Sequence, residues 1–198
     1  MINENTPTLQ TERLILRRFV PGDAGALFSL LRDEEVNTFL PWFPLTTPEE
    51  AERFLQERFF AYYDKPSAYR YALCLREDDI PVGYICLSND ESHDFGYSLK
   101  KEFWHRGLVT EGARAVVERI RAAGSPYITA THDVHNPRSG GVMKKLGMTY
   151  RYSYVEQWQP KNIPVTFRMY QVNLDGCTGR VYREYWDKAQ TRFIETNI

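Results

Sequence analysis

The chain has 198 residues, of which 42% are hydrophobic and 26% are charged, and its formal net charge is −1 at pH 7. This length predicts one globular domain with a sizeable core, and the near-neutral charge gives no support for a nucleic-acid partner. No apolar run reaches the ~18 residues that a membrane helix needs, and the amino-terminal residues carry no secretory signal. Three cysteines without metal-ligand spacing fit a reducing compartment, so we expect a cytoplasmic protein with no membrane partner and no metal.

The first half of the chain predicts one strand, two helices and then a strand meander. Apolar and polar residues alternate over Arg13–Phe19, which is typical of a strand, and the residues 21–33 that follow have a helical apolar face. Thr47-Pro48-Glu49-Glu50 matches a capping box with proline at the first helical position, so a second helix is expected from there to about residue 63. Alternation and turn residues then predict three strands, over 69–76, 82–88 and 93–99.

The second half predicts two further helices, each preceded by a strand, and an antiparallel pair. A helix is expected over 108–123, and Gly124 ends it. A β-branched strand begins at Tyr127, and Asn136 and Pro137 then fit the N-cap and first position of a short helix. Residues 149–158 and 165–174 alternate on either side of a loop and predict paired strands.

The residues after Gly176 form a separate tail in this interpretation. Val181, Tyr185, Ala189 and Phe193 share one helical stripe, which predicts an amphipathic helix. We therefore divide the chain into a domain over 1–175 and a helical tail over 176–198. The tail is expected to pack on its own domain, with a dimer contact or a lid near the substrate as the alternatives.

The segment 94–123 carries the first functional signal. A strand breaks into a turn, the turn reaches Arg106-Gly107, and a helix follows at once. The first N–H groups of a helix have no intrahelical partner, and together with the helix dipole they favour an anion such as a diphosphate. Gly107 permits close backbone approach, and Arg106 adds charge.

Four segments in order resemble one known family. W-H-R-G-L-V-T-E (Trp104–Glu111) and N-P-R-S-x-x-V-M-K-K-L-G-M (Asn136–Met148) resemble the GNAT superfamily of acetyl-CoA-dependent N-acetyltransferases, and its RimJ/RimL branch in particular. T-E-R-L-I-L-R-R-F (Thr11–Phe19) and L-P-W (Leu40–Trp42) are also similar to that branch, and the resemblance spans roughly residues 8–174. Val109 departs from the usual Gly or Ala. Met143 stands where many members carry a tyrosine that acts as general acid, so no tyrosine can fill that role at this position.

The resemblance implies a fold of the α/β (α+β) class. It predicts a single GNAT-like domain with a mixed, mostly antiparallel central sheet of about seven strands flanked by helices. In the family the sheet is splayed between strands 4 and 5, here the strand over 93–99 and the strand that ends near His132, and the split admits the co-substrate.

The resemblance also implies that acetyl-CoA is the co-substrate. The diphosphate is expected at the start of the helix, and the pantetheine arm is expected to pair with the exposed strand edge. Asn136 and Ser139 match family positions that contact the coenzyme. The expected coenzyme-binding residues are therefore Tyr97, Ser98, Leu99, His105, Arg106, Gly107, Leu108, Val109, Thr110, Asn136 and Ser139.

Two residues are expected to act in catalysis. Asp94 matches the acidic position that opens the splayed strand in the superfamily, and we expect it to accept the proton of the amine, directly or through a water molecule. Asp90, Glu91 and His93 lie close enough in sequence to share this task. The backbone N–H of Leu99 is the expected donor to the developing oxyanion. Glu111, in the first helical turn, is expected to have a structural role.

The acceptor is less constrained by the sequence. Trp42 and Phe43 belong to a loop that borders the acceptor channel in the family, and Tyr84 and Tyr152 are expected to line the same cleft. The RimJ/RimL resemblance favours the α-amine of a protein or peptide N-terminus. The alternatives are a small-molecule amine (polyamine, aminoglycoside or amino acid) and a non-catalytic acyl-CoA-binding regulator. A homodimer is an open expectation. His132 and His135 lack a third metal ligand, and no G-x-S-x-G motif of a hydrolase is present.

Overall fold

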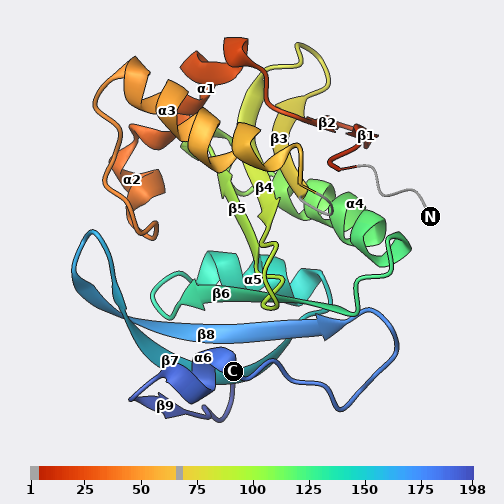
Figure 1. Cartoon of the computed structure of the whole chain (residues 1–198), viewed down its shortest axis with the longest axis vertical. Helices are drawn as coiled ribbons and strands as arrows, with labels where there is room; N and C mark the ends of the chain where they lie inside the picture. The colour runs from red at the N-terminus through yellow and green to blue at the C-terminus, as the bar shows by residue number, and fades with distance from the viewer. Residues whose placement is uncertain (1–4, 66–68) are drawn as a thin grey trace.

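The computed structural model describes residues 5–65 and 69–198, which form two antiparallel sheets (Figure 1). The first sheet has the order β1-β2-β3-β4-β5, and the second has the order β6-β8-β7-β9. The strands of the first sheet are β1 (Leu9–Gln10), β2 (Leu14–Arg17), β3 (Tyr69–Leu75), β4 (Pro81–Leu87) and β5 (Phe95–Leu99). Those of the second are β6 (Tyr127–Asp133), β7 (Thr149–Trp158), β8 (Ile163–Asn173) and β9 (Arg192–Phe193).

The helices before the tail fall where the sequence signals predict them, with short additions between. The α-helices are α1 (Ala24–Leu31), α2 (Glu34–Asn37), α3 (Pro48–Arg58), α4 (Leu108–Ala122), α5 (Pro137–Lys145) and α6 (Glu184–Lys188). The 3₁₀ turns in the described residues are η1 (Pro21–Asp23), η2 (Phe60–Tyr62) and η3 (Lys101–Phe103). Both expected caps are present: Thr47 and Glu50 form the capping box of α3, and Asn136 Oδ1 accepts the N–H of Ser139 at the start of α5. None of the helices in the described residues is both long and apolar enough to cross a membrane.

In the described part of the chain, backbone pairing joins the two sheets at one end of β5 and β6. Asp94 and Thr129 form a single parallel bridge, where the N–H of Thr129 donates to the carbonyl of His93 at 3.2 Å. Beyond this bridge the strands diverge, and in the described residues β5 has no further ladder on this side. The predicted α/β class and the predicted splay are therefore confirmed, and the two-residue strands β1 and β9 add to the seven expected.

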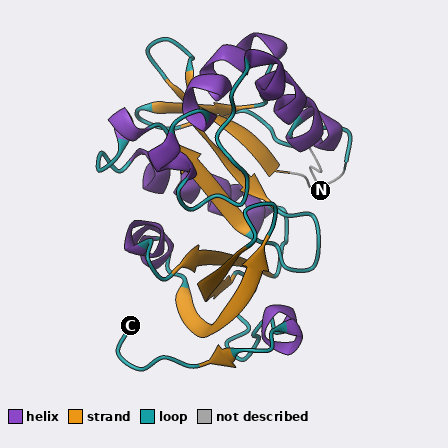
Figure 2. Ribbon diagram, turned by 90° about the vertical axis from the view of Figure 1, so that its left-hand side faces the viewer, coloured by secondary structure: helices purple, strands orange, loops and turns teal. Residues whose placement is uncertain are grey.

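Helices cover both faces of each sheet. Leu27, Leu30 and Leu31 of α1 and Leu55 of α3 pack on one face of the first sheet, and Val116, Val117 and Ile120 of α4 pack on the other. The second sheet lies between α5 and the tail that contains α6, as Figure 2 shows. This layering leaves the divergence of β5 and β6 as the place where the interior opens.

The tail does not form the amphipathic helix that its spacing predicts. Only Glu184–Lys188 is helical, while Arg192–Phe193 forms β9 on the edge of β7. The N–H of Val155 donates to the carbonyl of Thr191 at 2.9 Å, so the tail satisfies backbone groups that an exposed sheet edge would leave unpaired. A helix of this length is marginal in isolation, which explains why the sheet pairing prevails.

One close approach holds β4 against β5. A Cβ atom added at Gly83 would lie 2.2 Å from the backbone carbonyl of Ser98. Because backbone atoms cannot move aside without separating the strands, Gly83→Ala is expected to lower the free energy of unfolding by about 3 kcal/mol or more, as measured by urea denaturation. Gly96→Ala on the neighbouring strand is the matched control, since nothing lies within 4 Å of its added Cβ. Equal losses in the two variants would contradict this packing.

Candidate active site

A cleft of about 1090 Å³ opens where β5 and β6 diverge. It is bounded by β5, by the amino-terminal ends of α4 and α5, and by the α2 region on the opposite side. The β7–β8 hairpin closes one end: Trp158 lines the cleft, and Lys161 Nζ donates to the carbonyl of Asn37 at 2.7 Å. A single continuous space therefore joins the predicted coenzyme residues to the predicted acceptor residues.

The register of β5 decides which of its backbone groups face the cleft. The N–H of Ser88 donates to Asp94 O and the N–H of Lys100 donates to Val82 O, each at 2.8 Å, so the even-numbered residues of β5 direct their backbone groups to β4. The N–H groups of Tyr97 and Leu99 therefore point to the open edge. The backbone of Ser98 faces β4, so only its side chain lines the cleft. Its backbone therefore cannot pair with the pantetheine arm, contrary to the prediction from the sequence.

The start of α4 presents uncapped backbone amides to the cleft. Gly107 occupies the N-cap position with φ of 76°, and no side chain of residues 5–65 or 69–198 caps this helix. His105 also has a positive φ of 62°, whereas Arg106 does not, so left-handed and right-handed residues alternate before the helix. Turns of this kind, called nests, direct backbone N–H groups towards an anion. His105, Gly107, Leu108, Val109 and Thr110 all line the cleft.

Arg106 lies outside the cleft lining, unlike its neighbours. Its carbonyl accepts a hydrogen bond from Arg13 Nη1 at 3.0 Å, and its guanidinium lies 5.4 Å from the ring centroid of Phe103. The basic groups that do line the coenzyme side are Arg138 and Lys145 of α5. Sequence reasoning missed both, although they lie within the Asn136–Met148 motif.

Glu111 anchors the first turn of α4 to the β1–β2 connection. Its carboxylate accepts hydrogen bonds from Thr11 Oγ1 at 2.6 Å, from the N–H of Arg13 at 2.9 Å and from Arg13 Nε at 2.7 Å. Burial alone would raise the pKa of this carboxyl group. The hydrogen bonds and the charge of Arg13 have the larger effect, so the pKa lies below its usual value. The carboxylate faces away from the cleft chemistry, in agreement with a structural role.

Glu111→Gln is expected to lower the free energy of unfolding at pH 7 by about 1–2 kcal/mol, because it removes a charged acceptor of three hydrogen bonds. A lowered folded-state pKa contributes stability that is present above the unfolded pKa and is lost as pH falls through the folded one. The difference between wild type and variant should therefore shrink in acid, as followed by thermal unfolding from pH 7 to pH 3. A difference that is independent of pH would contradict the assignment.

The start of α5 faces β5 across the cleft. Ser139 is held by Tyr97, whose hydroxyl donates to Ser139 O at 2.8 Å and lies 2.9 Å from Ser139 Oγ. Arg138 lies over the ring of Trp104 with 5.1 Å between guanidinium and centroid, and Trp104 Nε1 donates to Leu99 O at 2.8 Å. Asn136 lines the cleft while it caps the helix, so its two expected roles are compatible. Met143 is buried against the core.

Asp94 lies at the point where the two sheets separate, and it lines the cleft. Its Oδ1 atom is buried and has no hydrogen-bond partner among the described residues. Burial, and then the negative charges of Asp90 and Glu156, raise the pKa of this carboxyl group from 3.8 to about 7. A carboxylate with this pKa is poised to exchange a proton at neutral pH.

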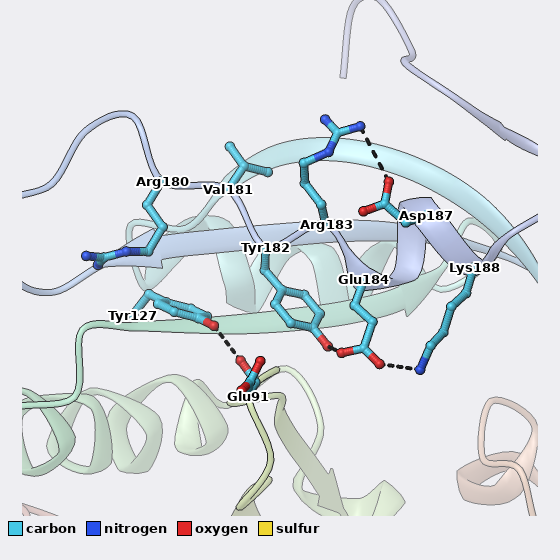
Figure 3. Close-up of a pocket in the computed structure, with 9 residues that line it drawn as sticks. All are labelled: Glu91, Tyr127, Arg180, Val181, Tyr182, Arg183, Glu184, Asp187 and Lys188. Atoms are coloured by element: carbon cyan, nitrogen blue, oxygen red, sulfur yellow. Dashed lines mark hydrogen bonds and ion pairs between the residues drawn. The ribbon is translucent and has the colours of Figure 1, made fainter.

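The other acidic and basic groups near Asp94 face elsewhere. Asp90 accepts the N–H of Ser92 at 2.9 Å, and the ring of His93 packs at 5.1 Å from that of Tyr127. Glu91 borders a second recess, of about 500 Å³, between the tail and the turn before Asp94 (Figure 3). None of the three is among the residues that line the main cleft.

The charges that the segment 183–188 brings to the second recess are paired with one another. The tail residues Arg183 and Asp187 lie 3.7 Å apart, and Glu184 accepts from both Lys188 and Tyr182, as Figure 3 shows. The hydroxyl of Tyr127 donates to the carbonyl of Glu91. This recess is therefore a packing contact of the tail, and the chemistry belongs to the main cleft.

The predicted acceptor residues divide into two pairs. Trp42 and Tyr84 line the cleft, whereas Phe43 is 59% exposed and lies outside it. Tyr152 is buried in the tail contact, where its hydroxyl donates to the carbonyl of Tyr182 at 2.8 Å, so the expectation that it lines the cleft is wrong. The acceptor side also contains two arginines that sequence reasoning missed, Arg58 and Arg70.

The histidines near this site show no metal-binding arrangement. His132 Nδ1 lies 2.7 Å from the carbonyl of Asp133, and His135 Nδ1 lies 3.0 Å from Asp133 Oδ1. Within residues 5–65 and 69–198 no group of three His, Cys, Asp or Glu side chains is placed to hold a metal ion.

Comparison with known proteins identifies the class to which this fold and cleft belong. A sequence model of the acetyltransferase (GNAT) domain matches residues 13–149. The uncharacterized N-acetyltransferase YnaD of Bacillus subtilis strain 168 is 26% identical over 157 residues, which cover 77% of this chain and 88% of YnaD. The chain therefore belongs to the GNAT acetyltransferase family, and it is an acyltransferase that uses acetyl-CoA.

Solved structures agree on the fold. RimL, a ribosomal L7/L12 alpha-N-protein acetyltransferase in complex with coenzyme A, matches with a TM-score of 0.75 at 18% identity, over 86% of this chain and 100% of that chain. A GNAT-family acetyltransferase from Bacillus anthracis matches with a TM-score of 0.73 at 22% identity, over 85% of this chain and 99% of that chain. At these low sequence identities, both matches show that the fold is similar and nothing more.

Proposed function

We propose that this chain transfers the acetyl group of acetyl-CoA to the α-amine of a protein or peptide N-terminus, by direct attack within a ternary complex. The observation that carries this proposal is the carboxylate of Asp94, which is buried, unpaired and placed at the divergence of β5 and β6. The RimL likeness supports a peptide acceptor in preference to a small-molecule amine.

The residues of the cleft fit acetyl-CoA. The uncapped amides from His105 to Thr110 suit a diphosphate, and Arg138 and Lys145 add positive charge beside them. The open edge of β5 offers the N–H of Tyr97 to an extended amide chain. When bound, acetyl-CoA supplies an activated thioester carbonyl.

The residues of this chain divide the chemistry among them. The amine is delivered without its proton, which passes to Asp94 directly or through a water molecule, because a protonated ammonium has no lone pair. The amine nitrogen then bonds to the thioester carbon and the carbon–sulfur bond breaks. The second proton of the nitrogen passes to the departing sulfur, directly or through water, and the leaving group departs as the CoA thiol. The N–H of Leu99, on the open edge of β5, stabilises the oxyanion that forms in between.

Release of the CoA thiol tests the proposal. The purified chain and acetyl-CoA are incubated with peptides that carry a free or a blocked N-terminus, and with a polyamine, an aminoglycoside and free amino acids, and products are identified by mass spectrometry. We expect turnover of free N-termini and none of blocked ones. Turnover of the small molecules alone would show that the acceptor is a small-molecule amine and not a peptide N-terminus. CoA binding by calorimetry without turnover of any amine would contradict a catalytic role.

A further inference from the structure

The acceptor side of the cleft is built on one face of three adjacent strands. Arg70 of β3 is the register partner of Cys86 of β4, and Cys86 is the partner of Gly96 of β5. Side chains two residues apart on a strand share a face, so Asp94 lies on the same face as this row. Arg70 and Asp94 therefore project into the same cleft from strands two spacings apart.

Arg70 carries a buried donor without an acceptor. Its Nε atom is buried and has no hydrogen-bond partner among the residues that the structure describes, and its guanidinium stacks 3.6 Å from the ring centroid of Tyr62. It forms no ion pair with any described residue. A buried donor left without a partner is costly, which favours an acceptor supplied by a ligand.

Two further donors converge on the same place. Trp42 Nε1 is also buried without a partner, and Arg58 lies over the Trp42 ring at 5.5 Å from its centroid. The register places Arg70 beside Cys86, and Arg58 lines the same cleft. Burial raises the pKa of the Cys86 thiol to about 11, against the charge and hydrogen bond of Arg70 and the charge of Arg58. Trp42, Arg58 and Arg70, two of them cationic, thus all line the acceptor side of the cleft.

The carboxylates that line the cleft do not neutralise these arginines. Glu35 pairs with Lys101, and Asp133 accepts the N–H of His135 at 2.8 Å. Asp94 has an unpaired oxygen atom and a pKa raised by burial and by negative neighbours, without an arginine among the causes. The acceptor side of the cleft therefore has an excess of positive charge.

We propose that the acceptor amine carries a carboxylate, which Arg70, Arg58 and the indole N–H of Trp42 bind while the amine meets Asp94. This inference rests on the proposed transfer reaction and specifies its substrate. Arg70 and Asp94 lie two strands apart across the sheet and two residues apart along it. Standard sheet geometry therefore puts their Cα atoms roughly 12 Å apart. Side chains from both ends shorten that span, so the carboxylate fits within the first three residues of a peptide, or on a free acidic amino acid.

The test compares acceptors that differ only in charge. Initial rates of CoA release are measured with H-Ser-Asp-Glu-Ala-NH₂ and H-Ser-Asn-Gln-Ala-NH₂. A second arm compares glutamate and aspartate with glutamine amide and asparagine amide, which carry no carboxylate. We expect kcat/KM to be at least about tenfold higher for the acidic member in one arm, the size of effect that one charge-assisted hydrogen bond produces. The arm that shows the preference identifies the source of the carboxylate.

Variants connect the preference to its residues. Arg70→Gln and Arg58→Gln should each bring the ratio of acidic to amide kcat/KM towards 1, whereas Arg53→Gln should leave the ratio unchanged. Arg53 is the matched control for Arg58, since it is exposed on the same helix and outside the cleft. CoA affinity and the melting temperature are recorded for each variant, and the comparison of acceptors in the wild type does not depend on how any variant folds.

The outcomes separate this inference from the proposed function. Turnover of both members of each pair at equal rates would overturn the carboxylate site and leave the transferase intact. A preference that survives both arginine replacements would also overturn it. Absence of turnover with every amine would instead refute the proposed function.

Discussion

Replacement of Asp94 by asparagine is expected to lower kcat/KM for acetyl transfer at pH 7 by at least about tenfold. Asparagine keeps the size of the side chain but cannot accept the proton of the amine, and acid–base groups contribute factors of about 10² to 10⁴ in rate. Steady-state rates of CoA release measure the loss. An unchanged rate would eliminate Asp94 as the base.

The pH profile separates loss of a base from general damage. Because Asp94 must be ionised to accept a proton and its pKa is about 7, wild-type kcat/KM should rise through pH 7. This rise of kcat/KM should disappear in Asp94→Asn. Only the rise that follows deprotonation of the acceptor amine, near pH 8, should remain. Glu156→Gln is the matched control: it removes a negative charge that raises the pKa of Asp94, so activity should persist and the first rise should move to lower pH.

Stability should change in the opposite direction to activity. The folded pKa of Asp94 is about 7 and the ordinary value is 3.8, so the folded state binds more protons between these values and loses stability as pH rises across that window. Asparagine removes the buried charge, so the melting temperature of Asp94→Asn at pH 8 should equal or exceed that of the wild type. A clearly lower melting temperature would mean that structural damage contributes to the loss of rate.

Gly107→Ala is expected to weaken CoA binding by about tenfold in isothermal titration calorimetry. Gly107 has φ of 76°, a region that costs other residues roughly 1–2 kcal/mol, and about 1.4 kcal/mol corresponds to tenfold in affinity. The alanine relieves this strain by moving the turn, and the amides at the start of α4 move with it.

The same helix provides the control for this prediction. Gly124 follows the other end of α4 with φ of 84°, and its added Cβ meets nothing within 4 Å. Gly124→Ala should therefore have a similar cost in stability without any change in CoA affinity. Equal dissociation constants for the two variants would contradict a role of the Gly107 turn in coenzyme binding.

Features with local signals could be predicted from the sequence. The capping box at Thr47 and the Asn136-Pro137 cap involve residues no more than three apart, so the starts of α3 and α5 could be predicted. The turn before α4 could be predicted because it lies within one continuous motif, and the position of Asp94 before β5 followed from the family resemblance. The split between β5 and β6 followed from the family resemblance, since no local pattern encodes it.

Features that depend on strand register could not be predicted. Arg70, Cys86 and Gly96 form one row only because β3, β4 and β5 pair in a particular register. The same register turns the backbone of Ser98 away from the cleft. The tail follows a helical stripe in sequence, but the free edge of β7 determines its structure and buries Tyr152 beneath it.

The position of the coenzyme diphosphate is central to the proposed function, and a crystal structure of the chain with bound CoA measures this position directly. We predict diphosphate oxygens within about 3 Å of backbone nitrogen atoms between His105 and Thr110, at hydrogen-bonding distance, with the pantetheine arm along the open edge of β5. A diphosphate bound elsewhere, with the first turn of α4 still in contact with solvent, would contradict the account.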